Sequence, residues 1–173
     1  MHADHCPLCD AETPEFFWGD VWSAPGKRVM RCPNCESFFL DPPTTEDEQR
    51  EFDAGYDRYI GARSELVSTH TDRSFAVLVD ESIETRFRDL KQWFEGRPSV
   101  LEIGAEKGGF LDRIAPLADQ LAAVDSCPEY KGILQAKGYR TYAYVWDLPP
   151  NETYDRICLF SLLEHIQRPR PFL

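Results

Sequence analysis

The sequence predicts an α/β protein, a parallel sheet alternating with helices, preceded by a small metal-binding module. Three observations lead to this prediction: a strand that enters a glycine-rich turn at 100–111, a second strand that ends at Asp125, and two C-x2-C pairs near the N-terminus. A chain of 173 residues has room for such a domain and a smaller module. We expect a metal module at 1–43, a helical connector at 44–97 and a cofactor-binding half-domain at 98–173.

Composition and charge narrow the class of protein. Hydrophobic residues make up 42% of the chain, which is typical of a folded globular protein. No apolar run approaches the roughly 18 residues of a membrane span, and the first residues do not resemble a signal peptide. The net charge of −11 disfavours a nucleic-acid partner. We therefore expect a cytoplasmic protein with neither membrane nor nucleic acid as a partner.

Two cysteine pairs predict a metal site. Each C-x2-C places two sulfurs on one tight turn, and two such turns complete a tetrahedral thiolate cage. Zinc is favoured, while a rubredoxin-like iron site and a pair of disulfides are the alternatives. Four thiolates leave no open coordination position, so we expect a structural metal, with His2 and His5 in solvent. The expected ligands are Cys6, Cys9, Cys32 and Cys35.

Short strands are expected between and after the cysteine pairs. Aromatic residues at 16–18 and the segment 27–31 flank a turn at 24–26, and a third strand at 38–40 precedes Pro42-Pro43. This order predicts a zinc ribbon, in which the metal supplies folding energy that so short a segment cannot obtain from a core.

The connector contains two helix signals. The segment 45–48 has acids suited to a first helical turn. A longer helix is expected to begin near Thr71 or Asp72 and to end before Gly96. Its apolar stripe should pack on the sheet, and it consists of Phe75, Val79, Ile83, Phe87, Leu90 and Phe94. Tyr56 and Tyr59 are core or surface residues, with a substrate entrance as the minority interpretation.

The second half of the chain predicts a nucleotide-type site. The strand at 100–103 leads through Gly104, Gly108 and Gly109 into a helix, a pattern that brings backbone N–H groups close to a ligand. Asp125 ends the next strand, 21 positions after Gly104, where a carboxylate can accept both hydroxyls of a ribose. The alternative role for Asp125 is to cap the following helix.

Two further strands complete the expected sheet. A short helix at 128–137 is followed by strands at 139–145 and 156–160. Strands that alternate with helices predict a parallel, doubly wound Rossmann-like sheet.

The combined motifs resemble class I S-adenosylmethionine-dependent methyltransferases. The glycine turn, the acid-tipped strand and the segment 154–166, YDRICLFSLLEHI, match the order of motifs in that family. The CPxC pairs, the Pro-Pro exit and the Tyr-Asp-x-x-Tyr segment at 56–59 resemble its branch with an N-terminal zinc ribbon.

The resemblance implies roles for individual residues. The loop of Glu102, Gly104, Ala105 and Gly108 would face the methionine part of the cofactor, and Asp125 would hold its ribose. Trp146 and Asp147 would border the adenine, and Phe160 with Ser161 would line the methyl-donor pocket. His165 would be the general base, because an imidazole can take a proton from a hydroxyl or amine. Its alternative role is to orient the loop after the strand, together with Glu164.

Two departures from the family pattern stand out. Glu106 occupies the middle glycine position of the family's turn, and the chain ends at Leu173, before the fifth to seventh strands. We therefore expect a core truncated after the fourth strand, whose free edge invites pairing with a second copy or another partner.

Methyl transfer from S-adenosylmethionine to a small-molecule acceptor is the expected function, with zinc as a structural cofactor. The resemblance implies a sugar or a secondary metabolite as the acceptor. A degenerate, non-catalytic methyltransferase that binds a partner through the zinc ribbon is the main alternative. A nicotinamide-dependent oxidoreductase is disfavoured, because Glu106 also interrupts the G-x-G-x-x-G fingerprint.

Overall fold

The computed structural model describes residues 4–19, 21, 25–45, 47–48, 51, 74–166 and 169–172. These residues form two compact units, one with the described residues of 4–51 and 161–172 and the other with 74–160. His2, the tyrosines at 56 and 59, and the expected caps at 71 and 72 lie outside the described residues. Among the described helices, none is long and apolar enough to cross a membrane.

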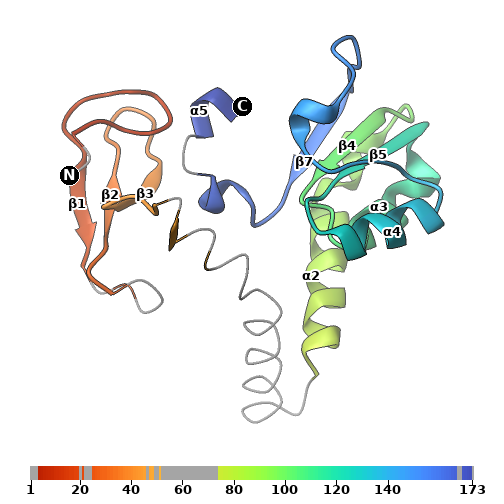
Figure 1. Ribbon diagram of the computed structural model, residues 1–173, viewed down its shortest axis with the longest axis horizontal. Helices are drawn as coiled ribbons and strands as arrows, with labels where there is room; N and C mark the ends of the chain where they lie inside the picture. The colour runs from red at the N-terminus through yellow and green to blue at the C-terminus, as the bar shows by residue number, and fades with distance from the viewer. Residues whose placement is uncertain are drawn as a thin grey trace. The chain divides into compact units, whose positions relative to one another are not determined.

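The first unit contains a three-stranded antiparallel sheet in the order β1-β2-β3 (Figure 1). Its strands are β1 (Glu15–Trp18), β2 (Arg28–Arg31) and β3 (Phe38–Asp41). Gly26, in the turn before β2, has a φ of +82°, which glycine adopts without steric cost. The strands predicted between and after the cysteine pairs are confirmed.

A buried ion pair joins β2 to β3. The side chain of Asp41 is 1% exposed, and its Oδ2 lies 2.6 Å from Nη2 and 2.8 Å from Nε of Arg28, the residue opposite it in the register. A carboxylate at this depth requires such a charge-assisted, two-point contact. The pair therefore helps to specify the register of a sheet in which Met30 is the one apolar strand residue that is buried among those described.

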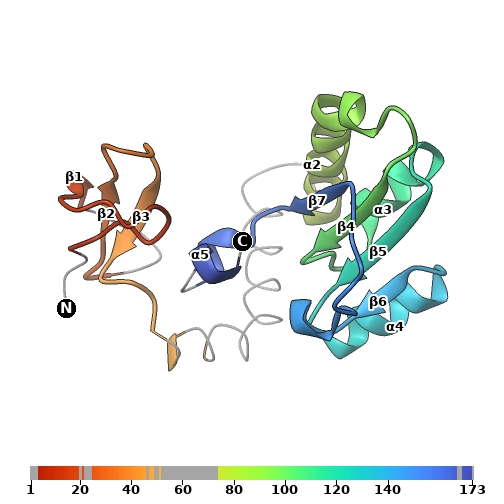
Figure 2. The same cartoon turned by 90° about the horizontal axis from the view of Figure 1, so that it is seen from above.

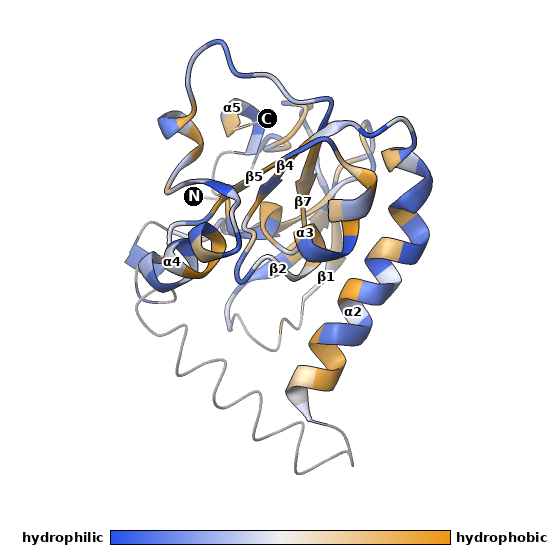
Figure 3. Cartoon of the chain, turned by 90° about the vertical axis from the view of Figure 1, so that its right-hand side faces the viewer, coloured by the Kyte–Doolittle hydropathy of each residue, from blue (hydrophilic) through white to orange (hydrophobic). Residues whose placement is uncertain are grey.

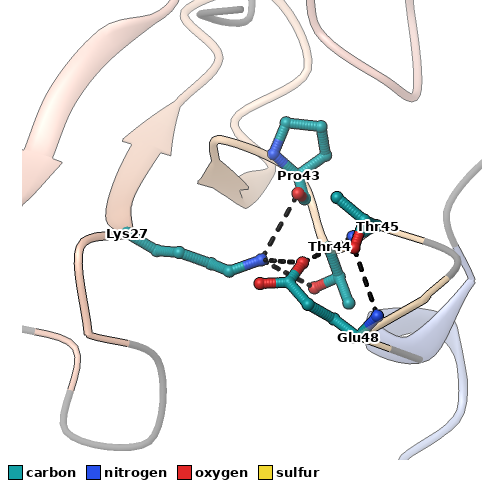
Figure 4. Close-up of polar contacts among 5 residues, drawn as sticks. All are labelled: Lys27, Pro43, Thr44, Thr45 and Glu48. Carbon is teal, nitrogen blue, oxygen red and sulfur yellow. Dashed lines mark hydrogen bonds and ion pairs between the residues drawn. The ribbon is translucent and has the colours of Figure 1, made fainter. Parts of the chain in front are cut away.

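Lys27 connects the start of β2 to the segment after β3 (Figure 4). Its Nζ donates to the carbonyl oxygen of Pro43 at 3.3 Å and lies 2.9 Å from Oε2 of Glu48. The same carboxylate accepts the backbone N–H of Thr45 at 2.6 Å, and Thr45 Oγ1 accepts the N–H of Glu48 at 3.2 Å. This reciprocal capping box is typical of a helix start, as the acids at 45–48 predicted. The Thr45 N–H and Lys27 lower the pKa of Glu48 to about 2.

The second unit contains a four-stranded parallel sheet in the order β6-β5-β4-β7 (Figure 2). The strands are β4 (Ser99–Ile103), β5 (Gln120–Val124), β6 (Arg140–Tyr142) and β7 (Arg156–Leu159). Successive strands are added outward from β4 to β6, and β7 then pairs on the opposite side of β4. This reversal is the topology of a doubly wound sheet, so the predicted fold class is confirmed.

The long connector helix is shorter than predicted. Helix α2 spans Phe75–Leu90, and the last turn of the predicted helix is instead the 3-10 helix η1 (Lys91–Phe94). Ser74 caps α2, because its hydroxyl accepts the N–H of Val77 at 3.3 Å. The tighter final turn is common at helix ends and precedes Gly96, whose φ is +85°.

The third strand is also shorter than predicted. β6 pairs with β5 only from Arg140 to Tyr142, and its last residue lies opposite Val124, where β5 ends. Beyond that point no described strand lies beside the chain, which forms the 3-10 helix η3 (Val145–Asp147). The prediction of strand up to residue 145 was wrong because pairing, not local propensity, determines where a strand ends.

The core of the second unit lies between the sheet and its helices. Helices α3 (Gly109–Ile114) and α4 (Pro128–Ala136) contribute buried residues to it, and η2 (Ala115–Leu117) follows α3. Figure 3 shows α2 with hydrophobic and hydrophilic residues interleaved along its length, next to α3, with which it makes contact. Of the predicted stripe on the connector helix, Phe87, Leu90 and Phe94 join the core, as expected.

Candidate functional site

The four cysteines of the first unit lie together at metal-binding distance. The Sγ atoms of Cys6 and Cys35 are 3.6 Å apart, as are those of Cys9 and Cys32, and all four lie within 4.8 Å of one another. Four thiolates around one tetrahedral zinc ion would be separated by about 3.8 Å, given Zn–S bonds of about 2.3 Å. A disulfide would require sulfurs about 2.05 Å apart. The donor set therefore fits a single tetrahedral metal ion.

Both cysteine turns have the same backbone pattern. The backbone carbonyl oxygen of Cys6 accepts the N–H of Asp10 at 2.9 Å, and the carbonyl oxygen of Cys32 accepts the N–H of Glu36 at 2.9 Å. Asp10 and Glu36 both have positive φ values, 63° and 59°. Two equivalent turns explain why sulfurs far apart in the sequence point at a common centre.

Polar groups around the sulfurs favour the thiolate form. The Nδ2 of Asn34 donates to Sγ of Cys9 at 3.5 Å, and the Ser37 hydroxyl lies 3.2 Å from Sγ of Cys35. The side chain and backbone N–H of Ser37 lower the pKa of Cys35 to about 6, whereas burial raises the pKa of Cys6 to about 12.

His5 is not a member of the cluster; its Nδ1 lies 3.3 Å from the Asp10 carbonyl oxygen.

In the second unit, the glycine turn joins β4 to α3. The N–H groups of Gly104 and Ala105 both donate to the carbonyl of Val124, at 2.8 and 3.3 Å, which brings the turn to the carboxyl end of β5. Gly108 has a φ of +75°, and a Cβ atom there would lie 2.8 Å from Cδ2 of Leu134. Glycine is thus required at 108 both by backbone conformation and by the close approach of α4.

Asp125 connects the glycine turn to the turn that precedes α4, at the carboxyl end of β5. Its Oδ2 accepts the N–H of Glu106 at 2.7 Å, and its Oδ1 accepts the N–H of Cys127 at 2.9 Å. The N-cap residue of α4 is Cys127, so the alternative role of Asp125 as that cap was wrong. Burial raises the pKa of the Asp125 carboxyl group. The carboxylate is therefore held in place between the glycine turn and the start of α4.

Glu102 is the other acid at this edge, and it is buried. Its side chain is 3% exposed, and Oε2 has no hydrogen-bond partner among the described residues. Burial raises its pKa to about 8, while the positive charge of Arg86 lowers it and the nearby acids raise it further. An unsatisfied buried carboxyl oxygen is costly, and it marks a position where a ligand donor would be accommodated.

A pH dependence follows from the raised pKa of Glu102. Between about pH 5 and pH 8, the folded protein holds a proton that the unfolded chain has released, so the free energy of unfolding should fall as the pH rises. The glutamine side chain of Glu102→Gln is neutral at every pH. This variant should therefore lack the decrease in the free energy of unfolding, on the order of a few kcal/mol, that wild type shows over this pH range. Urea denaturation at several pH values measures this difference. Glu129→Gln, on the exposed surface of α4, is the control; equal pH dependence of wild type and Glu102→Gln would contradict the prediction.

Trp146 and Asp147 lie in η3, after β6. Trp146 is 77% exposed, and its ring stacks on Tyr144 at a centroid distance of 4.7 Å and an angle of 9°. The Oδ2 of Asp147 accepts the N–H of Tyr144 at 2.9 Å and so stabilises the turn. The turn presents a flat aromatic surface to solvent, which suits a planar base.

Phe160 follows β7 and packs inward. Its ring contacts Phe110 edge-on at 4.7 Å, and the Arg86 guanidinium lies 4.6 Å from its centroid. Ser161 and His165, the latter in the 3-10 helix η4 (Leu163–His165), belong to the first unit with helix α5 (Pro169–Phe172). Their predicted roles near the glycine turn therefore remain predictions.

A groove of about 360 Å³ lies along β7, and no residue of the glycine turn lines it. Among the described strands β7 pairs only with β4, so its other edge is free, as expected for the fourth strand. The groove is lined by Leu90, Trp93, Phe94, Arg156, Ile157, Cys158, Leu159 and Phe160. A partner on this edge remains a prediction.

The profile of a family described as a methyltransferase domain matches residues 62–173, more than half of the chain. The chain belongs to this methyltransferase domain family. The glycine turn, Asp125 and Glu102 all lie within the matched region. A comparison with curated proteins gave no match.

Three solved structures illustrate the similarity of this methyltransferase domain to known folds. The YcgJ protein of Bacillus subtilis is 20% identical, with a TM-score of 0.37 over 46% of this chain and 37% of that one. An S-adenosylmethionine-dependent methyltransferase of Clostridium acetobutylicum is 14% identical, with a TM-score of 0.39 over 60% and 43%. The plantazolicin methyltransferase BpumL, in complex with SAH, is 16% identical, with a TM-score of 0.37 over 72% and 53%. The chain spans 37% to 53% of the length of these structures.

Sequence reasoning missed Arg86, a cation on α2 of the methyltransferase domain. The stripe on this helix was interpreted only as a packing face. Arg86 lies one turn after Ile83, at a position that continues the stripe, and a charged residue at such a position is the sequence signal for it.

Proposed function

We propose that this methyltransferase domain binds S-adenosylmethionine and, within the complete enzyme, transfers its methyl group to a small-molecule acceptor. The observation that carries the proposal is the buried, unsatisfied Oε2 of Glu102 beside the Gly104–Gly108 turn. This edge also holds the fixed carboxylate of Asp125. An acceptor for an ammonium group and an acceptor for ribose hydroxyls are the two features that the cofactor requires of the protein.

The bound cofactor would supply a methyl group activated by a positively charged sulfur. Glu102 would accept a hydrogen bond from the cofactor's amino group, and Asp125 would accept hydrogen bonds from its ribose. Trp146 and Asp147 would border the adenine, while Gly104, Ala105 and Gly108 leave room for the cofactor next to the backbone. The protein's main contribution would be to align donor and acceptor.

The acceptor side of the reaction rests on Phe160, Ser161 and His165. Phe160 and Ser161 would line the space around the methyl group, and the His165 imidazole would take a proton from a hydroxyl or amine acceptor. The resemblance to the zinc-bearing methyltransferases favours a sugar or a secondary metabolite as the acceptor. The four cysteines would hold a structural zinc ion.

Isothermal titration calorimetry with S-adenosylhomocysteine tests this proposal. A dissociation constant in the micromolar range would support it. The absence of binding at millimolar ligand would overturn it, because a methyltransferase must recognise the part of the cofactor that this product shares with the donor.

The backbone at Glu106 leads to a second prediction for the cofactor site. Its φ is +49°, a left-handed conformation that costs a non-glycine residue roughly 1 kcal/mol. Its charge would also face the carboxylate of the cofactor. Glu106→Gly should therefore stabilise the turn and raise the affinity for S-adenosylhomocysteine roughly 2- to 10-fold, because a like charge near the surface costs about 1 kcal/mol.

Glu106→Gln separates the two causes, because it removes the charge and keeps the side chain. An increase in affinity in both variants assigns the effect to charge, and an increase in Glu106→Gly alone assigns it to the backbone. Unchanged calorimetric affinity in both would show that Glu106 does not face the cofactor.

A non-catalytic binding protein is the second candidate function. The described residues of the first unit include four exposed aromatic side chains, Phe16 at 64%, Phe17 at 55%, Trp18 at 58% and Phe38 at 53% exposure. Exposed aromatic residues that adjoin one another, as Phe17 and Phe38 do at 4.6 Å, are typical of interaction surfaces. Failure to bind S-adenosylhomocysteine, with both units folded, would favour this function over the enzyme.

A further inference from the structure

One glutamate fastens the loop that runs from β6 to β7. The carboxylate of Glu152 accepts the hydroxyl of Tyr142 at 2.7 Å and the hydroxyl of Tyr154 at 2.6 Å. Nη1 of Arg140, which stands two positions before Tyr142 on the same face of β6, donates to the same carboxylate. The side chain of Glu152 is only 12% exposed, and the hydroxyls of Tyr154 and Tyr142 lower its pKa. An ionised carboxylate thus gathers three donors around one point of the loop.

The bond between Tyr142 and Glu152 closes this loop at its neck. Tyr142 is the last residue of β6, and Glu152 lies ten positions further along the chain. The stacked rings of Tyr144 and Trp146 lie between them, on η3. The N–H of Asp147 donates to the carbonyl oxygen of Tyr144 at 3.0 Å, a bond that shapes the turn without joining it to the sheet. Glu152 therefore ties the returning half of the loop to β6.

Two prolines stiffen the link between Trp146 and Glu152. Pro149 and Pro150 each have a φ fixed by their ring at about −65°. The N–H of Glu152 donates to the carbonyl oxygen of Pro149 at 2.9 Å, which folds the segment into a turn. A short segment with few free dihedral angles transmits the position of one end to the other. The place of Glu152 therefore restricts the place of the Trp146 ring.

We propose that Glu152 is a positioning residue for recognition of the cofactor's adenine, because it closes the loop that presents the Tyr144–Trp146 stack. This inference rests on the proposed function, in which η3 borders the base. An aromatic ring that is already held in place loses less conformational entropy when a planar base packs against it. The three donors around the carboxylate contribute to the same role through Glu152.

Two ligands that differ in the base test the inference, S-adenosylhomocysteine and S-ribosylhomocysteine, which has a hydroxyl group in place of adenine. Glu152→Ala should weaken calorimetric binding of the first roughly 3- to 10-fold, the effect of one further side chain to be ordered on binding. Binding of the second should be unchanged. A residue that served only the stability of the domain would affect both ligands alike. Equal weakening of the two, or no weakening of the first, would overturn the inference.

A double-mutant cycle with Trp146→Ala tests whether Glu152 acts through this ring. In the Trp146→Ala background, Glu152→Ala should cause no further loss of affinity for S-adenosylhomocysteine, since the ring that it positions is gone. Additive losses, or unchanged affinity in Trp146→Ala itself, would overturn the inference. The cycle also decides the question if S-ribosylhomocysteine binds too weakly to be measured.

Glu84→Ala is the matched control, because it also separates a glutamate from an arginine, Arg113, but on α2. It should bind both ligands as wild type does. Should Glu152→Ala fail to fold, Tyr142→Phe decides, since it removes the hydrogen bond at the neck and keeps the ring. This variant should bind S-adenosylhomocysteine roughly 2- to 5-fold more weakly, and unchanged affinity would overturn the inference. A wild-type chain that does not bind S-adenosylhomocysteine would instead refute the proposed function itself.

Discussion

Cys32→Ser should release the metal from the first unit and unfold it. The side chain of Cys32 is fully buried, and its sulfur is one of four within 4.8 Å. Structural zinc sites contribute on the order of 10 kcal/mol to the folding of small modules. The three short strands bury too little apolar surface to replace that contribution, so loss of one thiolate should remove most of the stability of this unit.

Metal analysis and thermal denaturation measure the effect of Cys32→Ser. Wild type should contain about one zinc ion per chain, and the variant well under one, with loss of the unfolding transition of the first unit. Cys127→Ser, outside the cluster, is the control and should retain both. A variant with wild-type thermal stability, or a wild-type protein with little zinc, would contradict a structural zinc site.

Asp125→Ala should reduce the affinity for S-adenosylhomocysteine at least about 100-fold, because two hydrogen bonds from ribose hydroxyls to a charged acceptor are lost. The same substitution removes the acceptor for the N–H groups of Glu106 and Cys127, so the two turns also lose their connection. Both effects act on the cofactor site.

The ribose contact can be separated from the amino-acid contacts with 5′-methylthioadenosine, which has the nucleoside but no amino acid. Asp125→Ala should weaken binding of this ligand as well. Asp119→Ala, an exposed acid just before β5 at the opposite end of the strand from Asp125, is the matched control. Calorimetric affinities equal to those of wild type in Asp125→Ala would show that the ribose does not bind there.

Much of the fold could be predicted because its signals are local. The C-x2-C pairs, the turn at Gly104–Gly108 and the acid at the end of β5 depend on a few neighbouring residues, and the structure contains each of them. The errors occurred at ends of elements. The last turn of the connector helix and the end of β6 depend on which neighbour is available, and a single sequence does not contain that information directly.

The acids of the candidate site could also be predicted from the sequence, but their surroundings could not. Asp125 was identified from its place at the end of a strand beside the glycine turn, because parallel strands bring these ends together, whereas Glu102 was identified from the family resemblance. The burial of Glu102 could not be predicted, since it results from the packing of α2 and α3 over the sheet.

The sequence by itself determined the architecture of this methyltransferase domain, the four sulfur ligands and the acids that end its strands, since these follow from spacing along the chain. Only the tertiary structure decided which sulfurs lie 3.6 Å apart across the two turns, that Oε2 of Glu102 lacks a hydrogen-bond partner among the described residues, and that Arg86 lies over the Phe160 ring. The physical reason is that burial and electrostatic pairing depend on contacts between residues far apart in the chain. These contacts bring the buried Glu102 and the fixed Asp125 to the edge of the sheet that carries the glycine turn.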